Sequence, residues 1–204
     1  MTTEYGSLFP STATPAAEAP PYVYVGFGER FAARIIDTVL HYGVGIMAMI
    51  FVAILAFLVQ ALGGPSVDAT MARLDGEGFW PFAAGLLGLL IYETLCEGLF
   101  GSTAGKYMLG MVVLKDDGTR CTLQAALKRS VAFFFDSLFF GLIAWNVMKD
   151  SPEKKRVGDN WADTIVVKRK SAPAGVLHRP LRFAVVFLVA IALDGIAVGV
   201  GMLF

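Results

Sequence analysis

Acidic side chains lie inside apolar stretches of this chain, at spacings that suit the exchange of protons or cations. Glu93 and Glu97 are four residues apart, so they share one face of a helix. Two like charges at this spacing repel each other, and we expect at least one of them to be protonated or paired with a base. A carboxyl group that titrates near neutral pH can exchange a proton for a cation. The candidate ion or proton carriers are Asp37, Glu93, Glu97 and Asp136.

A second group of charges opens the first long apolar segment. Arg30, Asp37 and His41 fall on one helical stripe, with Arg34 beside them. An isolated Asp or Arg at the centre of a bilayer costs at least about 2.5 kcal/mol, so these side chains should face protein or water. We interpret Arg30 and Asp37 first as residues that orient this helix, because buried ion pairs often set helix register. His41 is more typical of a packed or interfacial histidine than of a proton relay.

Bases elsewhere in the chain should neutralise these acids. Lys106 follows the second apolar segment and is expected at the depth of the lipid headgroups. Arg129 and Asp136 are seven residues apart on one helical face, which predicts a buried ion pair. Structural pairing is therefore expected for Arg34, Lys106 and Arg129.

Other kinds of site are not recognisable in the sequence. The segment from Gly101 to Lys106 resembles a phosphate loop, but it has too few residues between its glycines, and Tyr107 stands where Ser or Thr is required. Cys96 and Cys121 are too few and too poorly spaced for a metal or redox motif. We therefore expect no enzyme activity, no catalytic residues, no metal and no cofactor, and neither a nucleotide nor a nucleic acid as a partner.

The composition is that of an integral membrane protein. The chain has 204 residues, of which 56% are hydrophobic and only 17% are charged. The segments 101–130 and 149–182 are rich in Lys and Arg, whereas the loop 63–79 is mainly acidic. The positive-inside rule places both basic segments in the cytoplasm and the acidic loop outside.

Three apolar segments are long enough to span a membrane. They run over Glu29–Leu62, Pro81–Phe100 and Phe183–Phe204. In the last one Asp194 must find a partner, in this chain or another, and Gly195 and Gly199 are spaced for close helix packing. The predicted organisation is a disordered tail at 1–21, a membrane domain at 22–170, a linker at 171–182 and an additional transmembrane helix at 183–204.

The stretch Leu123–Met148 is harder to place, because spanning would leave one basic segment outside. We favour a re-entrant or interfacial helical hairpin bent near Gly141, with full spanning of 131–148 as the alternative. Strands at Met111–Lys115 and Ile165–Lys168 can pair on the cytoplasmic surface. The predicted fold is an all-α integral membrane protein with three spanning helices, this hairpin and a small cytoplasmic β element.

Three motifs occur in one order. The first is Gly26-Phe27 with Arg30-Phe31, Ala33 and Ile36-Asp37; the second is Gly101-Ser102-Thr103 with Gly105-Lys106, Leu109-Gly110 and Val113; the third is Arg156 with Asp159, Ala162, Thr164 and Val166-Val167. Together they resemble the RDD family of bacterial membrane proteins over about Val25 to Val167. The resemblance implies that the family arginine is Arg30, that the first aspartate is Asp37, and that the second is Asp159, with Asp136 as the other candidate. This chain departs from the family at Gly158, where a His is frequent, and the last helix lies outside the shared pattern.

The resemblance implies a multi-pass protein of the bacterial cytoplasmic (inner) membrane, with a role in transport and sodium/proton antiport proposed for some members. Our first hypothesis is an ion or small-solute transporter that exchanges cations and protons at intramembrane carboxylates. Three spans are few to enclose a pathway, which favours a homo-oligomer. The alternative is a non-transporting membrane subunit, assembly factor or accessory protein that docks a membrane-protein partner through Asp194, Gly195 and Gly199. In either case the lipid bilayer is a partner, and basic residues between Lys154 and Lys170 should contact anionic lipid.

Overall fold

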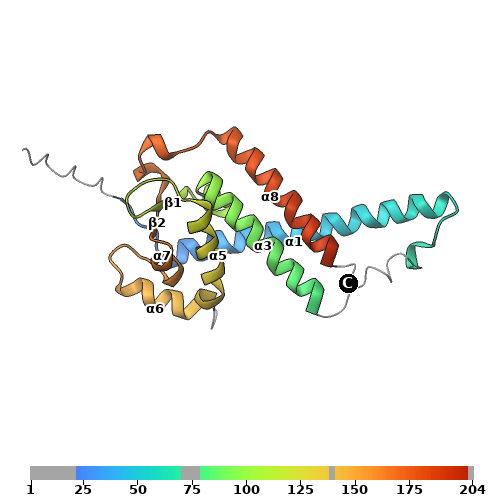
Figure 1. Cartoon of the computed structure of the whole chain (residues 1–204), viewed down its shortest axis with the longest axis horizontal. Coiled ribbons are helices and arrows are strands. Elements are labelled where there is room, and N and C mark those ends of the chain that lie inside the picture. Colours follow the sequence, from blue (N-terminus) through green and yellow to red (C-terminus); the bar gives the residue numbers. More distant parts are fainter. Residues whose placement is uncertain (1–21, 70–78, 138–140, 202–204) are drawn as a thin grey trace, which may run out of the picture.

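The computed structural model describes the chain except for residues 1–21, 70–78, 138–140 and 202–204. Figure 1 shows long helices on one side and a compact group of short helices and strands on the other. The predicted tail at 1–21 lies outside the described residues.

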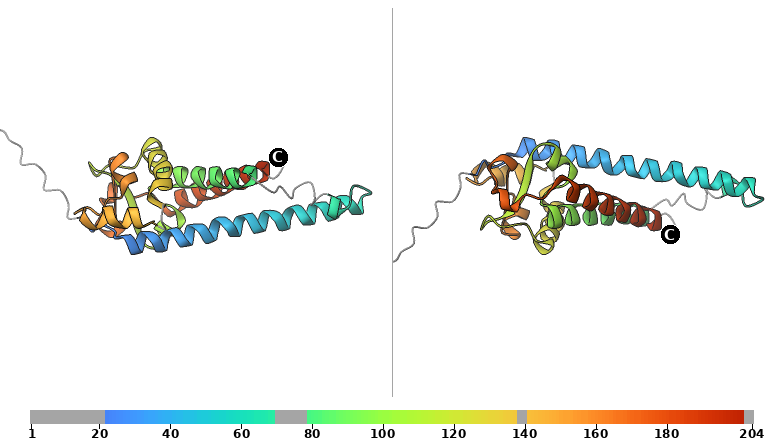
Figure 2. Two further views of the ribbon diagram at one scale, coloured as in Figure 1. Left: turned by 90° about the horizontal axis from the view of Figure 1, so that it is seen from below. Right: turned by 90° about the horizontal axis from the view of Figure 1, so that it is seen from above.

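Three of the described helices are long and apolar enough to cross a membrane, as predicted. They are α1 (Phe27–Ala61), α3 (Phe79–Phe100) and α8 (Pro180–Gly201). Helices α3 and α8 run along each other in opposite directions, and α1 lies beside them and projects beyond their outer ends (Figure 2). At about 1.5 Å per residue, the 35 residues of α1 exceed the roughly 30 Å of a hydrocarbon core.

Aromatic and small side chains hold α3 against α8. Tyr92, Cys96 and Ala190 form a buried cluster between the two helices. The ring of Tyr92 meets that of Phe187 edge to face, with 6.2 Å between centroids. A Cβ atom on Gly195 would meet nothing within 4 Å, so this predicted packing residue makes no close helix contact with the described part of the chain, and the surroundings of Gly199 lie outside the described residues.

The two predicted strands pair in a small antiparallel sheet. Strand β1 (Met111–Lys115) lies against β2 (Thr164–Lys168), with Val113 opposite Val166. The segment before α1 extends the sheet, because Val25 donates its N–H to Val166 O at 3.0 Å and Lys168 donates to Val23 O at 2.8 Å. The start of α1 is thereby anchored to β2. The side of the membrane on which the sheet lies stays a prediction.

The stretch 123–150 forms two helices with a break near Gly141, α5 (Leu123–Ser137) and α6 (Leu142–Asp150). Gly141 has a φ of 84°, a conformation that side chains disfavour. Neither helix is among the described segments long and apolar enough to span, and their depth in the membrane stays a prediction.

Two further short helices, α4 (Ala104–Met108) and α7 (Val157–Trp161), were not predicted. The predicted linker at 171–182 contains the 3-10 helix η3 (Ala174–Val176) and begins at the last residue of η2 (Arg169–Ser171), and α8 begins earlier than predicted.

Candidate functional site

The polar core of the molecule centres on Asp159, a fully buried residue of α7. Its carboxylate forms ion pairs with Arg30 of α1 and Arg129 of α5, and it accepts the backbone N–H of Arg156 at 3.1 Å. Burial alone would raise the pKa of Asp159, but the guanidinium groups of Arg129 and Arg30 hold that pKa well below its usual value. Asp159 therefore stays ionised and joins α1, α5 and α7.

Arg129 is the largest of the fully buried side chains in the described structure. Its Nε donates to Glu97 Oε2 and its Nη1 to Thr164 Oγ1, each at 2.8 Å. Burial alone would lower the pKa of Arg129, but Asp159 and Glu97 raise it. Lys106, which we expected among lipid headgroups, is buried with its Nζ 2.5 Å from Glu97 Oε1. Arg129 thus connects α3, α7 and β2.

The predicted ion pair between Arg129 and Asp136 is wrong. Asp136 instead accepts the backbone N–H groups of Val157 and Gly158, each at 3.2 Å, and its Oδ2 lies 3.6 Å from Arg156 Nε. Helix α7 packs against α5 and brings its first N–H groups to this carboxylate. Burial raises the pKa of Asp136, although Arg156 opposes that effect.

Asp37 is held by hydrogen bonds rather than by a basic side chain among the described residues. It accepts from Tyr92 Oη at 2.9 Å, Thr103 Oγ1 at 2.7 Å and the backbone N–H of Gly105 at 2.8 Å. Helix α4 approaches α1 so closely that a Cβ on Gly105 would lie 2.1 Å from Ala33 O. Asp37 therefore fastens α4 to α1.

Glu93 and Glu97 have separate basic partners, so each is already neutralised. Glu93 forms an ion pair with Arg34 of α1, whereas Glu97 is shared by Lys106 and Arg129. The Arg34 guanidinium also stacks on the ring of Phe133, 3.7 Å from its centroid. We expected at least one of Glu93 and Glu97 to be protonated or paired with a base, and in the structure both are paired.

The core is unfavourable for an added cation. Its bases are Arg30, Arg34, Lys106, Arg129 and Arg156, and its acids are Asp37, Glu93, Glu97, Asp136 and Asp159. A cavity of about 30 Å³ within it is lined by all these bases but by only two of the acids, Asp37 and Glu93. Such a space holds a water molecule, but a cation there would meet mainly positive charge.

A protein-family model matches residues 24–163 and is that of the RDD family. The chain belongs to the RDD family. A search of curated proteins and a search of solved structures found no match. The resemblance that the three motifs indicated is confirmed, over nearly the same residues.

Two of the residues that carry the RDD resemblance are in contact, since Arg30 pairs with Asp159. Asp37 lies in the same core but on separate hydrogen bonds. Which of Asp159 and Asp136 is the second RDD aspartate stays a prediction. At Gly158 a Cβ would lie 3.1 Å from Ala132 Cβ, so the packing of α7 on α5 leaves little room for a larger side chain in this RDD protein.

Sequence reasoning missed Tyr92 and gave no contact to three residues that it had named only as parts of the motifs, Thr103, Arg156 and Thr164. A tyrosine hydroxyl inside an apolar helix needs a hydrogen-bond partner, and this signal could have identified Tyr92. Thr103 precedes a short helical sequence and accepts the N–H of Lys106 at 3.4 Å as its N-cap. Arg156 and Thr164 stood in the third motif, but their contacts with Asp136 and Arg129 join distant parts of the chain and could not be read from local spacing.

Asp194 lies on α8, outside the matched RDD segment, and its partner is in the same chain. His41 Nδ1 of α1 is 2.7 Å from Asp194 Oδ2. The other oxygen, Oδ1, is buried without a hydrogen-bond partner in the described structure. A cavity of about 170 Å³ adjoins the pair, lined by His41, Tyr42, Val44, Gly45, Gly85, Asp194 and Gly195. Apart from the pair itself, the residues that line this cavity are one tyrosine, one valine and three glycines, so the lining contains no Lys, Arg or second carboxyl group.

Proposed function

We propose that this RDD protein crosses the bacterial cytoplasmic membrane three times, with the basic segments and the β1–β2 sheet on the cytoplasmic side. The α5–α6 hairpin then lies at the inner surface or re-enters the membrane. The distribution of Lys and Arg supports this orientation. A cysteine placed at the exposed Asp117 should react with a membrane-impermeant maleimide only after the cells are opened. Labelling in intact spheroplasts would contradict the orientation.

We propose further that the protein exchanges protons for a monovalent cation at the His41–Asp194 pair. The observation that carries this proposal is the unpartnered Asp194 Oδ1, buried within a membrane helix beside a cavity. A carboxylate at this depth must be neutralised by a proton, by a protonated His41 or by a bound cation. In the exchange, the Asp194 carboxyl releases its proton as the cation binds its oxygens, so the net charge does not change.

The earlier candidates suit this role less well. Glu93, Glu97 and Asp136 lie beside bases, and Asp37 faces a base-rich cavity. A cation that binds near these groups must overcome repulsion by guanidinium and ammonium charges. The pair on α1 and α8 has no such neighbours among the residues that line its cavity. We therefore propose a structural role for the core and an exchange role for Asp194.

Proteoliposomes that contain a trapped pH indicator test the exchange. With an imposed pH gradient, adding sodium or potassium should dissipate the gradient in vesicles with the wild-type protein. Asp194→Asn should abolish the effect, because the amide cannot release a proton at Oδ. Asp68→Asn is the matched control, since Asp68 is exposed in the loop after α1.

Two results would overturn the exchange. One is unchanged flux in Asp194→Asn, and the other is no flux from folded wild-type protein with any monovalent cation. In the second case the accessory-subunit hypothesis gains support, because the outer half of α1 exposes apolar side chains such as Ile54 and Phe57. Mass determination in mild detergent would then distinguish a homo-oligomer from a complex with another membrane protein.

A further inference from the structure

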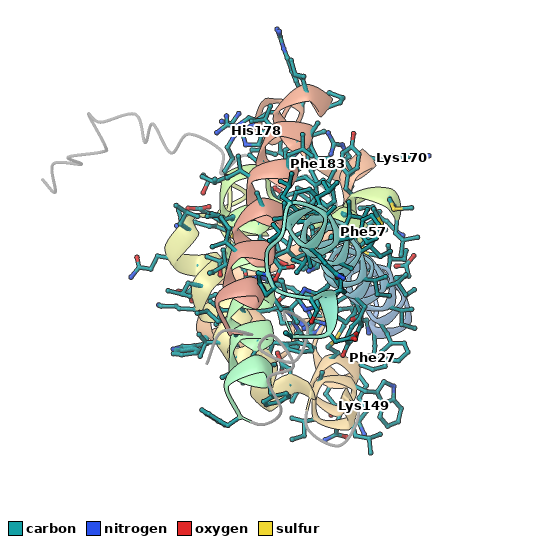
Figure 3. The ribbon with its side chains drawn as sticks, turned by 90° about the vertical axis from the view of Figure 1, so that its right-hand side faces the viewer. Phe27, Phe57, Lys149, Lys170, His178 and Phe183 are labelled. Atoms are coloured by element: carbon teal, nitrogen blue, oxygen red, sulfur yellow. The ribbon has the colours of Figure 1, made fainter. Side chains whose placement is uncertain are left out.

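A third and larger cavity lies between the start of α1, the end of α5 and helix α6. Its volume is about 230 Å³. Most of its wall is apolar and is formed by Phe27, Phe31, Phe133, Ala144 and Met148. Figure 3 shows Phe27, which lines this cavity, on the same side of the molecule as Lys149 of α6, away from His178 and Phe183. The cavity is separate from the one beside the His41–Asp194 pair, because the two share no lining residue.

Arginine side chains form the polar part of this cavity. Arg30, Arg34 and Arg156 line it, together with one acid, Asp136. The carboxylate of Asp136 is already occupied by the first N–H groups of α7. The polar part of the wall therefore presents mainly positive charge to a ligand.

Arg156 is the least satisfied of these bases. Its Nε is buried without a hydrogen-bond acceptor in the described structure, and Asp136 Oδ2 and Asp159 Oδ1 each lie 3.6 Å from it. A buried donor without an acceptor is unfavourable, and guanidinium groups bind phosphate oxygens well. Arg129 Nη2 is likewise unsatisfied and belongs to the smaller cavity, which shares Arg156 with this one. Both guanidinium groups therefore have a donor that an anionic oxygen would satisfy.

We propose that this cavity binds an acidic phospholipid, whose phosphate contacts Arg156 and Arg34 and whose acyl chain packs on Phe27, Phe31 and Met148. Apolar walls that end in guanidinium groups match an amphiphile with an anionic head, and the surrounding membrane supplies such molecules. Lys149, in the last turn of α6 next to Met148 of the cavity wall, adds a further positive charge that attracts an anionic headgroup. The inference does not depend on the proposed exchange, because the two cavities share no residue.

Binding can be measured on the full-length protein after delipidation in mild detergent. The probes are a short-chain phosphatidylglycerol, phosphatidylcholine with the same chains, and inorganic phosphate. The readouts are native mass and the shift in unfolding temperature. The wild-type protein should retain one phosphatidylglycerol, with affinity at least about tenfold above that for phosphatidylcholine, equivalent to about 1.4 kcal/mol.

Two variants locate the site. Ala144→Phe should fill the cavity and weaken phosphatidylglycerol binding at least about tenfold, whereas Leu142→Phe, at an exposed position of the same helix, should not. Arg156→Gln should weaken it without filling the cavity, and Lys170→Gln, which removes an exposed base, is its control. Arg156→Gln thus tests the site even if Ala144→Phe does not fold.

Three outcomes would overturn the proposal. Equal binding of phosphatidylcholine would mean that the walls select only hydrocarbon. Inorganic phosphate that binds as tightly as phosphatidylglycerol would identify a free-anion site without a lipid chain. Unchanged phosphatidylglycerol binding in folded Ala144→Phe or Arg156→Gln would place the lipid elsewhere.

Discussion

Replacement of Arg129 by methionine should destabilise the protein more than any exposed substitution in α5. Arg129 is 1% exposed and forms ion pairs with Glu97 and Asp159. Methionine keeps much of the volume but leaves the five core acids with four bases. Removing one partner of a buried ion pair costs about 3–5 kcal/mol, because an uncompensated charge remains. Lys128→Met is the matched control, since Lys128 is the neighbouring base and is partly exposed.

Unfolding in a mild non-ionic detergent, followed by tryptophan fluorescence, measures the difference. If charge imbalance is the cause, adding Glu97→Gln to Arg129→Met should recover part of the lost stability. The reasoning is refuted if Arg129→Met is no less stable than Lys128→Met, or if Glu97→Gln lowers the stability further.

The pH dependence gives an independent check on the same residue. The pKa of Asp159 is lowered in the folded state, so its contribution is complete above the unfolded pKa of about 3.9 and is lost as the pH falls towards the folded pKa. Wild-type stability should therefore decline below about pH 4. Because Arg129 is the larger of the charges that lower this pKa, the decline should be shallower in Arg129→Met. An equal slope in both proteins would contradict the assignment.

Three further predictions concern close contacts. Gly88→Ala should slow cation exchange and destabilise the protein by about 1–3 kcal/mol, because its Cβ would lie 2.0 Å from Asp194 Oδ1. Gly28→Ala, which has nothing within 4 Å of its Cβ and lies away from the His41–Asp194 cavity, should do neither; equal exchange rates in the two variants would contradict this. Gly105→Ala should destabilise the folded protein by a similar amount, about 1–3 kcal/mol, since the added Cβ forces α4 away from the α1 backbone. Thermal unfolding measures this loss, and a variant as stable as the wild type would refute the contact. Burial raises the pKa of Cys121 to about 12, so the thiolate that reacts with maleimide is scarce at pH 7. Maleimide should therefore modify this thiol only after unfolding, and rapid labelling of the folded protein would disprove its burial.

Sequence reasoning predicted the features that depend on local composition. The three long helices, the two strands and the break near Gly141 follow from runs of apolar residues, alternation and a glycine that tolerates positive φ. Helices α4 and α7 were missed because five residues are too few for a periodic pattern. Their formation depends on capping and on contacts with α1 and α5.

The choice of partners could not be predicted in the same way. Arg129 and Asp136 share a face of α5, and spacing alone pairs them with each other. In the structure, α3 supplies Glu97 and α7 supplies Asp159 to Arg129, while the start of α7 occupies Asp136. Spacing along one helix says nothing about which other helix covers that face.

The sequence by itself determined that this is an RDD-family membrane protein with acids and bases inside apolar segments, because hydropathy and motifs are properties of short stretches. Only the tertiary structure decided that Asp159 meets Arg30 and that Asp194 meets His41, across 129 and 153 residues of chain. These contacts depend on the depth and rotation of each helix. Close approaches between helices, such as those at Gly88 and Gly105, set the depth and the rotation of each helix, and these approaches exist only in the folded chain.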